Sequence, residues 1–395
     1  MAVSVLKSRQ VGKSLARVGA RVGGDGIDKY IVWLVMGLCA FGVVAVYSAI
    51  SFLAETKSSG NTESFLFRHV VRVALSLGAM GVFSVVSYRV VARFSRILLV
   101  GSIGLLIAVQ LVGVSSGGAA RWLQLGSVGF QPSDIAKVAL LIHVAVLLTR
   151  KQEYIKRLRR AFVPLFLWIL GTVAMIGMED LSSAALVLAA AVTVCFVGRV
   201  SVIHLGGLGL MSVILAFLLL LASPNRAARV ESYLGLKIFP HTSSEQVFDA
   251  QDEGYQKQQA RIAIALGGVT GVGPGKSTQR DFLPAPYNDF IFAIIAEEYG
   301  LLGALTLLSV FAALLFRGLL RIGRRAPDPL GLFIAVGLTT LLALYGFVHA
   351  GVAVGLLPVT GLPLPFVSYG GTSMVANGVM IGILLNVGRT ANREA

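Results

Sequence analysis

The stretch AFVPLFLWILGTVAMIGMEDLSSAALVLAAAVTVCFVG, residues 161–198, decides the fold, because it is apolar along almost its whole length. It far exceeds the roughly 20 apolar residues that one helix needs to cross a bilayer. Glu179 and Asp180 interrupt it near the middle. We therefore predict two spans, 161–178 and 181–198, joined by a tight turn. The alternative is one broken helix, which would reverse the orientation of every later segment.

Eight more apolar segments flank this stretch. They lie near residues 30–50, 69–87, 97–114, 135–149, 202–222, 290–316, 330–353 and 373–388. Charged residues make up only 13% of the chain, whereas a soluble domain typically carries about 25%. We therefore predict an all-α polytopic membrane protein of about ten transmembrane helices, with a single domain over residues 30–388. Cys39 and Cys195 both lie in apolar segments, so no disulfide framework or metal site is predicted.

The distribution of basic residues predicts the orientation. The formal net charge is +15, and 22 of the 34 Lys and Arg residues fall in segments that face the cytoplasm if both termini do. Those segments are 1–29, 88–96, 150–160, 199–201, 317–329 and 389–395. Cytoplasmic loops carry such an excess, so we predict cytoplasmic tails at 1–29 and 389–395 and a large extracytoplasmic loop at 223–289. No nucleic acid is needed as a partner to explain the charge.

Polar residues gather in three extracytoplasmic regions, of which the first covers 115–134. Small residues around Arg121 and Trp122 predict a reentrant or interfacial stretch. The alternative is a Trp of the aromatic belt beside an Arg that reaches the interface. Asp134 is placed to cap the next helix and to pair with Lys137 one turn later. Lys137 lies within an apolar segment, where a charged side chain is costly enough to predict a functional role.

The second region, 223–289, contains an amphipathic segment and a glycine-rich run. Residues 244–267 mix polar and apolar side chains as a helix resting on a membrane surface does. The run GGVTGVGPGKST, at 267–278, resembles a P-loop only in its last letters, because Thr270 stands where the first glycine is required and no strand precedes it. The run could still offer Lys276 and backbone N–H groups to a pyrophosphate. A plain flexible loop is the alternative.

Acidic residues mark the entry of the second region into the next span. Asp289 is either a helix N-cap, a common role for aspartate, or a partly desolvated carboxylate with a raised pKa that could accept a proton. Glu297 and Glu298 lie about two turns deeper, where adjacent acids should face a polar interior or cations. The third region, 354–372, is rich in proline and glycine. It predicts irregular backbone at the wall of a cavity.

Four motifs in these regions, in their order along the chain, resemble the signatures of the SEDS family (shape, elongation, division and sporulation). They are the small residues before Arg121-Trp122, the Gln131-Pro132-Ser133-Asp134 stretch with Lys137, Asp289-Phe290-Ile291-Phe292 followed by Glu297-Glu298, and Pro363-Leu364-Pro365-Phe366-Val367-Ser368-Tyr369-Gly370-Gly371. The resemblance extends over nearly the whole chain, from near Tyr47 to near Asn386.

This resemblance implies a peptidoglycan glycosyltransferase that polymerises lipid II, an undecaprenyl-diphosphate-linked disaccharide-peptide, at the outer leaflet of the bacterial inner membrane. It implies Asp289 as the catalytic residue, which takes a proton from the attacking hydroxyl while Arg121 and Lys137 meet the charge of the departing pyrophosphate. The predicted substrate-binding residues are Arg121, Trp122, Gln131, Ser133, Lys137, Lys276, Glu297, Glu298, Ser368 and Tyr369. No tightly bound cofactor is expected, and a divalent cation, Mg²⁺ or Mn²⁺, is an optional aid to the pyrophosphate.

The resemblance also implies protein partners, namely a class B penicillin-binding protein and other membrane proteins of the division complex. Residues 273–280 are more similar to the division members of the family than to the elongation members, which predicts a place at the division septum. Residues 358–361 also suit the elongation members. Two other classes stay open: a lipid II flippase and a non-catalytic division scaffold. A flippase needs a polar path across the membrane, and Arg199 and His204 are too sparse to line one on the inner side.

Three positions depart from the family pattern. Tyr287-Asn288 stand where the family usually has His-Thr, directly before Asp289, so the pKa of this aspartate could be tuned differently. Glu179-Asp180-Leu181-Ser182-Ser183 stand in place of Pro-Asp-Leu-Gly-Thr, and Asp134 in place of Glu. The last two changes keep an acid.

Overall fold

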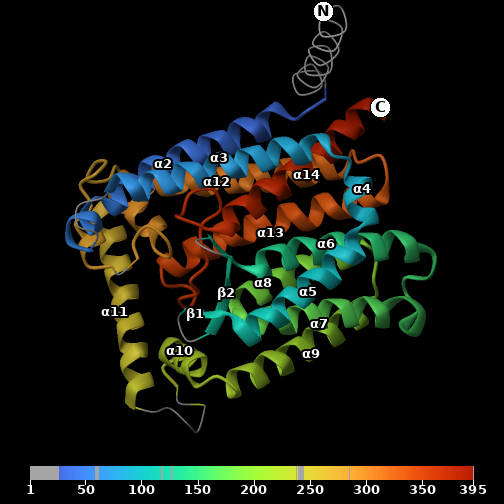
Figure 1. Cartoon of the computed structure of the whole chain (residues 1–395), viewed down its shortest axis with the longest axis horizontal. Coiled ribbons are helices and arrows are strands. Elements are labelled where there is room, and N and C mark those ends of the chain that lie inside the picture. Colours follow the sequence, from blue (N-terminus) through green and yellow to red (C-terminus); the bar gives the residue numbers. More distant parts are fainter. Residues whose placement is uncertain are drawn as a thin grey trace, which may run out of the picture.

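The computed structural model describes residues 26–57, 62–116, 119–125, 128–236, 238, 244–283 and 285–394. Most of them form long helices that lie side by side in one bundle (Figure 1). These are α2 (Lys29–Lys57), α3 (Thr62–Val85), α5 (Ser95–Val112), α6 (Pro132–Lys151), α7 (Val163–Glu179), α8 (Leu181–Val197), α9 (Val202–Leu221), α12 (Ile291–Phe316), α13 (Pro329–Ala353) and α14 (Thr372–Glu394). Shorter helices are α4 (Tyr88–Arg93), α10 (Pro224–Leu234), η1 (Gln152–Tyr154), η2 (Leu158–Phe162), η3 (Gln279–Asp281) and η4 (Arg317–Gly323).

The predicted polytopic helical fold is confirmed. Among the described residues, nine helical segments are long and apolar enough to cross a membrane. The tenth predicted span corresponds to α8, a shorter apolar helix. One boundary differs from the prediction, because α14 continues through residues 389–394, where we expected a tail.

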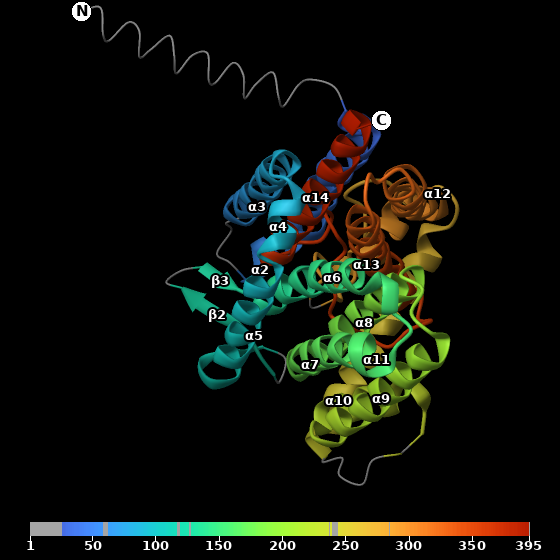
Figure 2. The same cartoon turned by 90° about the vertical axis from the view of Figure 1, so that its right-hand side faces the viewer.

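Three helices form the centre of the bundle. In α6 and α14, 83% of the spanning residues are buried, and in α13 72%, against 11% in α9. Figure 2 shows α6 and α13 inside the bundle and α9 at its edge. A helix surrounded by other helices can carry polar side chains that lipid would not accept. The central helices are therefore the ones able to hold a polar site.

The turn between α7 and α8 settles the ambiguity of residues 161–198. The α7 helix ends at Glu179, and Asp180 has an extended backbone with φ −151° and ψ 106°. The Asp180 carboxylate accepts hydrogen bonds from the backbone N–H groups of Ser182 (3.1 Å) and Ser183 (3.2 Å), which makes it the N-cap of α8. Because α7 and α8 also pack against each other, the predicted tight turn is confirmed and the single broken helix is excluded.

The first of the three polar regions forms a small β-sheet, an addition to the helical fold that the sequence analysis did not predict. Strands β1 (Val114–Ser116), β2 (Ala119–Leu125) and β3 (Val128–Phe130) pair in antiparallel order β1-β2-β3. Leu123 pairs with Phe130, and two residues separate the strands at each turn. Such short connections suit antiparallel hairpins. Pairing within the sheet satisfies backbone groups that a reentrant coil would leave open.

The sheet, α10 and α11 (Ser244–Gly267) lie at one end of the bundle, here called the site end (Figure 1). The α11 helix crosses the ends of the spanning helices, as expected for a helix on a membrane surface. The two described ends of the chain meet at the opposite end, here called the terminal end, where Asn392 Nδ2 donates to the Gly26 carbonyl (2.8 Å). This placement agrees with both termini on one side; the cytoplasmic sidedness stays a prediction.

The glycine-rich run packs tightly against α12. A Cβ atom on Gly271, whose φ is 83°, would lie 2.1 Å from the Glu298 carbonyl oxygen. The N–H groups of Val272 and Gly273 donate to the Glu297 and Glu298 carbonyls, each at 3.0 Å. Only glycine permits this approach and this backbone conformation. The run is therefore a packing element, and the flexible-loop alternative does not hold for its first half.

Candidate active site

Asp289 lies at the site end, in the turn that leads into α12. It does not cap that helix, because Phe290 occupies the N-cap position without a capping side-chain bond. Its Oδ1 atom is buried and has no hydrogen-bond partner. Burial raises the pKa of Asp289 to about 6, while Arg121 and Arg229 act to lower it and Asp180 to raise it further. The N-cap alternative is thus excluded, and the carboxylate has the properties of a proton acceptor.

Two arginines converge on the carboxyl end of α7, and one of them, Arg121, also acts on the Asp289 carboxylate. Arg121 Nε, on β2, donates to the Glu179 carbonyl at 2.9 Å. Arg226 Nη1, on α10, donates to the Gly177 carbonyl at 2.6 Å, and its Nη2 to the Met178 carbonyl. The carboxyl end of a helix carries partial negative charge, which favours cations there. Each guanidinium has five N–H donors, so both retain N–H groups for an anionic ligand.

Lys137 lies inside a chain of polar contacts that connects α6 to the turn between α7 and α8. Its Nζ atom is 2.8 Å from Asp134 Oδ1, as predicted, and both side chains are almost fully buried. It also lies 3.5 Å from the Tyr345 hydroxyl and 4.7 Å from the centre of that ring. Tyr345 donates to Ser183 Oγ (3.2 Å), which donates to Asp180 Oδ2 (2.5 Å). Lys137 is therefore linked to Asp180, one of the charges that act on Asp289.

Ser133, Gln131 and Trp122 join this network at its edge. Ser133 is buried beside the Glu179 carboxylate. The Gln131 N–H donates to Thr372 Oγ1 (3.2 Å), whose hydroxyl donates to Asp134 Oδ2 (2.6 Å). Trp122 packs against Gly371, where a Cβ atom would lie 3.1 Å from its ring. Residues 115–134 and 354–372, two of the three polar regions, are thus brought together.

Ser368 and Tyr369 hold the turn that carries Asp289. Ser368 Oγ donates to the Asn288 carbonyl and accepts from the Leu364 N–H, both at 2.8 Å. The Tyr369 N–H donates to the Tyr287 carbonyl (3.0 Å), and the two rings meet edge to face at 5.6 Å. The third region therefore positions the two residues that directly precede Asp289, Tyr287 and Asn288.

Glu297, Glu298 and Lys276 have other surroundings. Glu297 accepts hydrogen bonds from Ser277 Oγ and from the Thr278 N–H (2.9 Å). Glu298 accepts from Ser48 Oγ of α2. Among the described residues, no hydrogen bond or ion pair joins either acid to Asp289. The Glu297 side chain is a buried anchor of the loop that follows α11, and the buried Glu298 side chain is bonded to α2, while Lys276 in that loop is exposed. Their predicted role in substrate binding stays a prediction.

Arg226, Arg229 and Tyr345 belong to the site although the sequence did not single them out. The loop 223–289 is nearly balanced in charge, so Arg226 and Arg229 did not stand out within it. Tyr345 lies in the apolar segment 330–353, which contains no Asp, Glu, Lys or Arg. The hydroxyl group of Tyr345, placed deep in a spanning segment, is the sequence feature that could have pointed to this residue. In the described part of the chain, no three His, Cys, Asp or Glu side chains gather closely enough to hold a metal ion.

Comparisons with known proteins agree on one family. Residues 29–393 match the family described as cell cycle protein, FTSW_RODA_SPOVE. The chain is 34% identical to a probable peptidoglycan glycosyltransferase FtsW of Geobacter sulfurreducens, over 91% of this chain and 94% of the relative. It is 34% identical to stage V sporulation protein E of Bacillus subtilis, over 92% of this chain and 97% of the relative.

Solved structures show the same fold. The Rod shape determining protein RodA of Thermus thermophilus superposes with a TM-score of 0.65 at 26% identity, covering 92% of this chain and 97% of that one. A chain from a structure described as structural coordination of polymerization and crosslinking by a peptidoglycan synthase complex superposes with a TM-score of 0.69 at 27% identity. It covers 92% of this chain and 98% of the other.

Proposed function

The chain belongs to the FtsW, RodA and SpoVE family of cell cycle proteins, and we propose that it is a peptidoglycan glycosyltransferase that polymerises lipid II with Asp289 as general base. The activity follows from relatives named as peptidoglycan glycosyltransferases that align over nine-tenths of the chain. One observation carries the role of Asp289: a carboxylate oxygen that is buried, unpaired and flanked by arginines. A purely structural aspartate would have its buried oxygens paired.

In the proposed reaction, the hydroxyl oxygen of one lipid-linked sugar attacks the anomeric carbon of another. The new carbon–oxygen bond forms as the bond from that carbon to the pyrophosphate breaks, and the electron pair leaves with the pyrophosphate. Asp289 takes the hydroxyl proton and later returns it to solvent. General-base assistance of this kind contributes about 10²–10⁴-fold. A single displacement inverts the anomeric centre.

The arginines at the end of α7 are proposed to receive the pyrophosphate. Arg121 and Arg226 retain N–H donors after capping α7, and charge-assisted bonds to phosphate are the strong kind. Lys137 already neutralises Asp134, so its proposed contribution is to hold Asp134 and Tyr345 in place beneath the site. A divalent cation would enter with the pyrophosphate. A loss of product in EDTA would support that part of the proposal.

The biological setting is proposed on narrower grounds. The curated relatives described above are FtsW and SpoVE proteins at 34% identity, whereas the RodA structure shares 26%. This difference favours the division branch, with a place at the septum of the bacterial inner membrane. The similarity to a chain of a peptidoglycan synthase complex supports a class B penicillin-binding protein as the partner.

The test is polymerisation of labelled lipid II by the purified protein with its class B partner. We expect glycan strands from the wild type and almost none from Asp289→Asn, which keeps the size of the side chain but cannot accept a proton. Asp281→Asn is the matched control, because Asp281 is an exposed aspartate of the same loop and should leave polymer yield unchanged.

Two outcomes would contradict the proposal. Equal polymer from wild type and Asp289→Asn would remove Asp289 as the base while leaving the enzyme intact. No polymer from the wild type, together with movement of lipid II between the leaflets of a vesicle, would make the protein a flippase.

A further inference from the structure

A surface groove lies at the terminal end, far from Asp289. It has a volume of about 690 Å³ and runs between α2 and the junction of α12 with η4. Six side chains that line it matter for the argument: Tyr30, Trp33, Phe316, Leu320, Arg321 and Arg325. The α2 and α12 helices pack against each other and both are membrane spans (Figure 1). The groove therefore opens toward lipid.

One wall of the groove is apolar and strongly exposed. Trp33 is 74% exposed, Leu320 61% and Phe316 60%. On a spanning helix, exposed apolar side chains of this size contact acyl chains. Trp33 and Tyr30 are also the residue types enriched where a bilayer meets water. The groove thus sits at the height of lipid headgroups, with its apolar wall toward the acyl chains.

The other wall is cationic. Arg317 and Arg321 lie one turn apart on η4, Arg325 lies in the turn that follows it, and all three line the groove. Arg317 is neutralised by Asp28, with Nε 2.7 Å from Oδ1, and its guanidinium stacks on Tyr30 at 4.1 Å. Arg321 and Arg325 are exposed and form no ion pair among the described residues. Two uncompensated guanidinium groups therefore face the groove.

The backbone at this point is unusual. Residues Arg317–Gly323 form a π-helix, a rare conformation that occurs frequently at functional sites. It lies directly before Arg324 and Arg325 and so sets the direction in which Arg325 points. Arg324, which is also exposed, does not line the groove. Only some of the neighbouring arginines therefore line the groove, so it is a defined cationic site and not part of a uniformly basic surface.

We propose that this groove binds one anionic phospholipid of the cytoplasmic leaflet. The lipid phosphodiester accepts hydrogen bonds from Arg321 and Arg325, and an acyl chain lies on Trp33, Phe316 and Leu320. Basic pockets between spanning helices on the cytoplasmic side bind anionic headgroups in this manner. A soluble phosphate would leave the apolar wall without a matching surface, and a partner helix would leave the two charges unpaired. The inference is independent of the proposed glycosyltransferase activity.

The test measures lipid binding to the delipidated, full-length protein by native mass spectrometry. We expect phosphatidylglycerol to bind at least tenfold more tightly than phosphatidylcholine with the same chains. The double variant Arg321→Gln/Arg325→Gln should lose about tenfold in phosphatidylglycerol affinity, since charge-assisted bonds to phosphate are among the strongest. Trp33→Ala should weaken both lipids, because it removes apolar contact only.

The matched control is Arg324→Gln/Arg393→Gln, which removes the same charge from two exposed arginines outside the groove. It should bind phosphatidylglycerol as the wild type does. Equal weakening in both double variants would show diffuse attraction to the basic surface and overturn the proposal. Displacement of phosphatidylglycerol by millimolar inorganic phosphate would identify a soluble-anion site and overturn it as well.

Discussion

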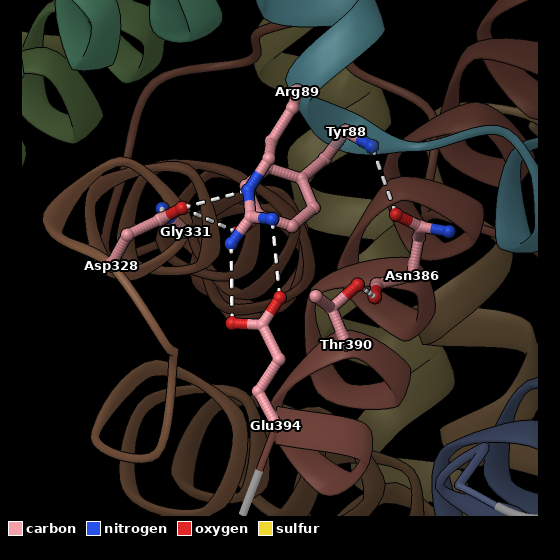
Figure 3. Close-up of polar contacts among 7 residues, drawn as sticks. All are labelled: Tyr88, Arg89, Asp328, Gly331, Asn386, Thr390 and Glu394. Atoms are coloured by element: carbon pink, nitrogen blue, oxygen red, sulfur yellow. Dashed lines mark hydrogen bonds and ion pairs between the residues drawn. The ribbon is translucent and has the colours of Figure 1, made fainter.

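The two ends of the bundle both carry polar networks, but the ion pairs at the two ends differ in their exposure to solvent. At the terminal end, Arg89 pairs with Asp328 and Glu394, and the three side chains are 47%, 28% and 46% exposed (Figure 3). At the site end, Lys137 and Asp134 are 5% and 6% exposed. The terminal network is fully paired, whereas the site network leaves a buried oxygen of Asp289 without a partner.

This difference separates structural from functional charge. Exposed ion pairs contribute about 0–1 kcal/mol because water already solvates both partners. Buried charges cost several kcal/mol to desolvate, so burial without full pairing indicates a function other than stability. The terminal network joins α4, the start of α13 and the end of α14, with the Tyr88 N–H donating to Asn386 (2.9 Å). The terminal network holds these three helices together at the surface. The site network instead holds charged groups in position for a function.

After the loss of product expected for Asp289→Asn, the largest expected effect is at Lys137. Lys137→Met keeps the stem but leaves Asp134 buried without its cation, which should destabilise the protein by roughly 3–5 kcal/mol. Misplacing the site by about 1 Å should lower polymerisation about a hundredfold. Thermal unfolding in detergent and lipid II polymerisation measure the two effects.

A second substitution separates these effects. Lys137→Met/Asp134→Asn removes the unpaired charge and should recover much of the lost stability without recovering activity. Recovery of both would mean that Lys137 only balances Asp134, and the site network would then resemble the terminal one.

The next effect is at Arg226, which the sequence did not reveal. Arg226→Gln removes charge-assisted bonds worth about 1.5–3 kcal/mol each, so kcat/KM for lipid II should fall about tenfold to a hundredfold. Arg226→Lys should recover part of this loss. Arg261→Gln is the control, an exposed arginine of α11 that should leave kcat/KM unchanged. Normal activity in Arg226→Gln would confine this arginine to capping α7.

The pH dependence of polymerisation should report on Asp289. Burial raises the pKa of Asp289 to about 6, and only the ionised form accepts a proton. Activity should therefore be flat above pH 6 and fall about tenfold for each pH unit below it. Arg229 acts to lower this pKa, so Arg229→Gln should move the fall in activity to higher pH. A fall centred near pH 4 in the wild type would mean that the Asp289 carboxylate is solvated and is not the buried base proposed here.

The sequence predicted the fold better than the site. Apolar segments of spanning length, the turn at Glu179 and Asp180, and the Lys137–Asp134 pair all follow from local pattern, because each depends on residues within one turn or one span. The β-sheet at 114–130 was missed, since strands of three, seven and three residues rich in small side chains show little alternation.

Local sequence patterns could not predict the contacts between segments that are distant along the chain. Glu297 accepts bonds from Ser277 and Thr278, which only the folding of the glycine-rich run against α12 brings near. Arg226 reaches the end of α7 from another helix. Two adjacent acids in a spanning segment give the same sequence pattern whether they bind a substrate or other residues of the protein. Only the three-dimensional structure shows which partners they have.

The smallest expected effect is at the terminal end. It tests whether exposed ion pairs there contribute little to stability and nothing to activity. Arg89 Nη1 and Nη2 lie 3.1 and 3.3 Å from the two Glu394 oxygens, and Nε lies 3.0 Å from Asp328. A double-mutant cycle of Arg89→Ala and Glu394→Ala should give a coupling of about 0.2–1 kcal/mol in unfolding free energy, because both side chains are nearly half exposed. Raising the salt to about 1 M should reduce it further, since the Debye length falls to about 3 Å. Polymerisation should not change in any of the three variants. A coupling above about 2 kcal/mol, or a loss of polymer, would show that exposure does not separate structural from functional charge in this bundle.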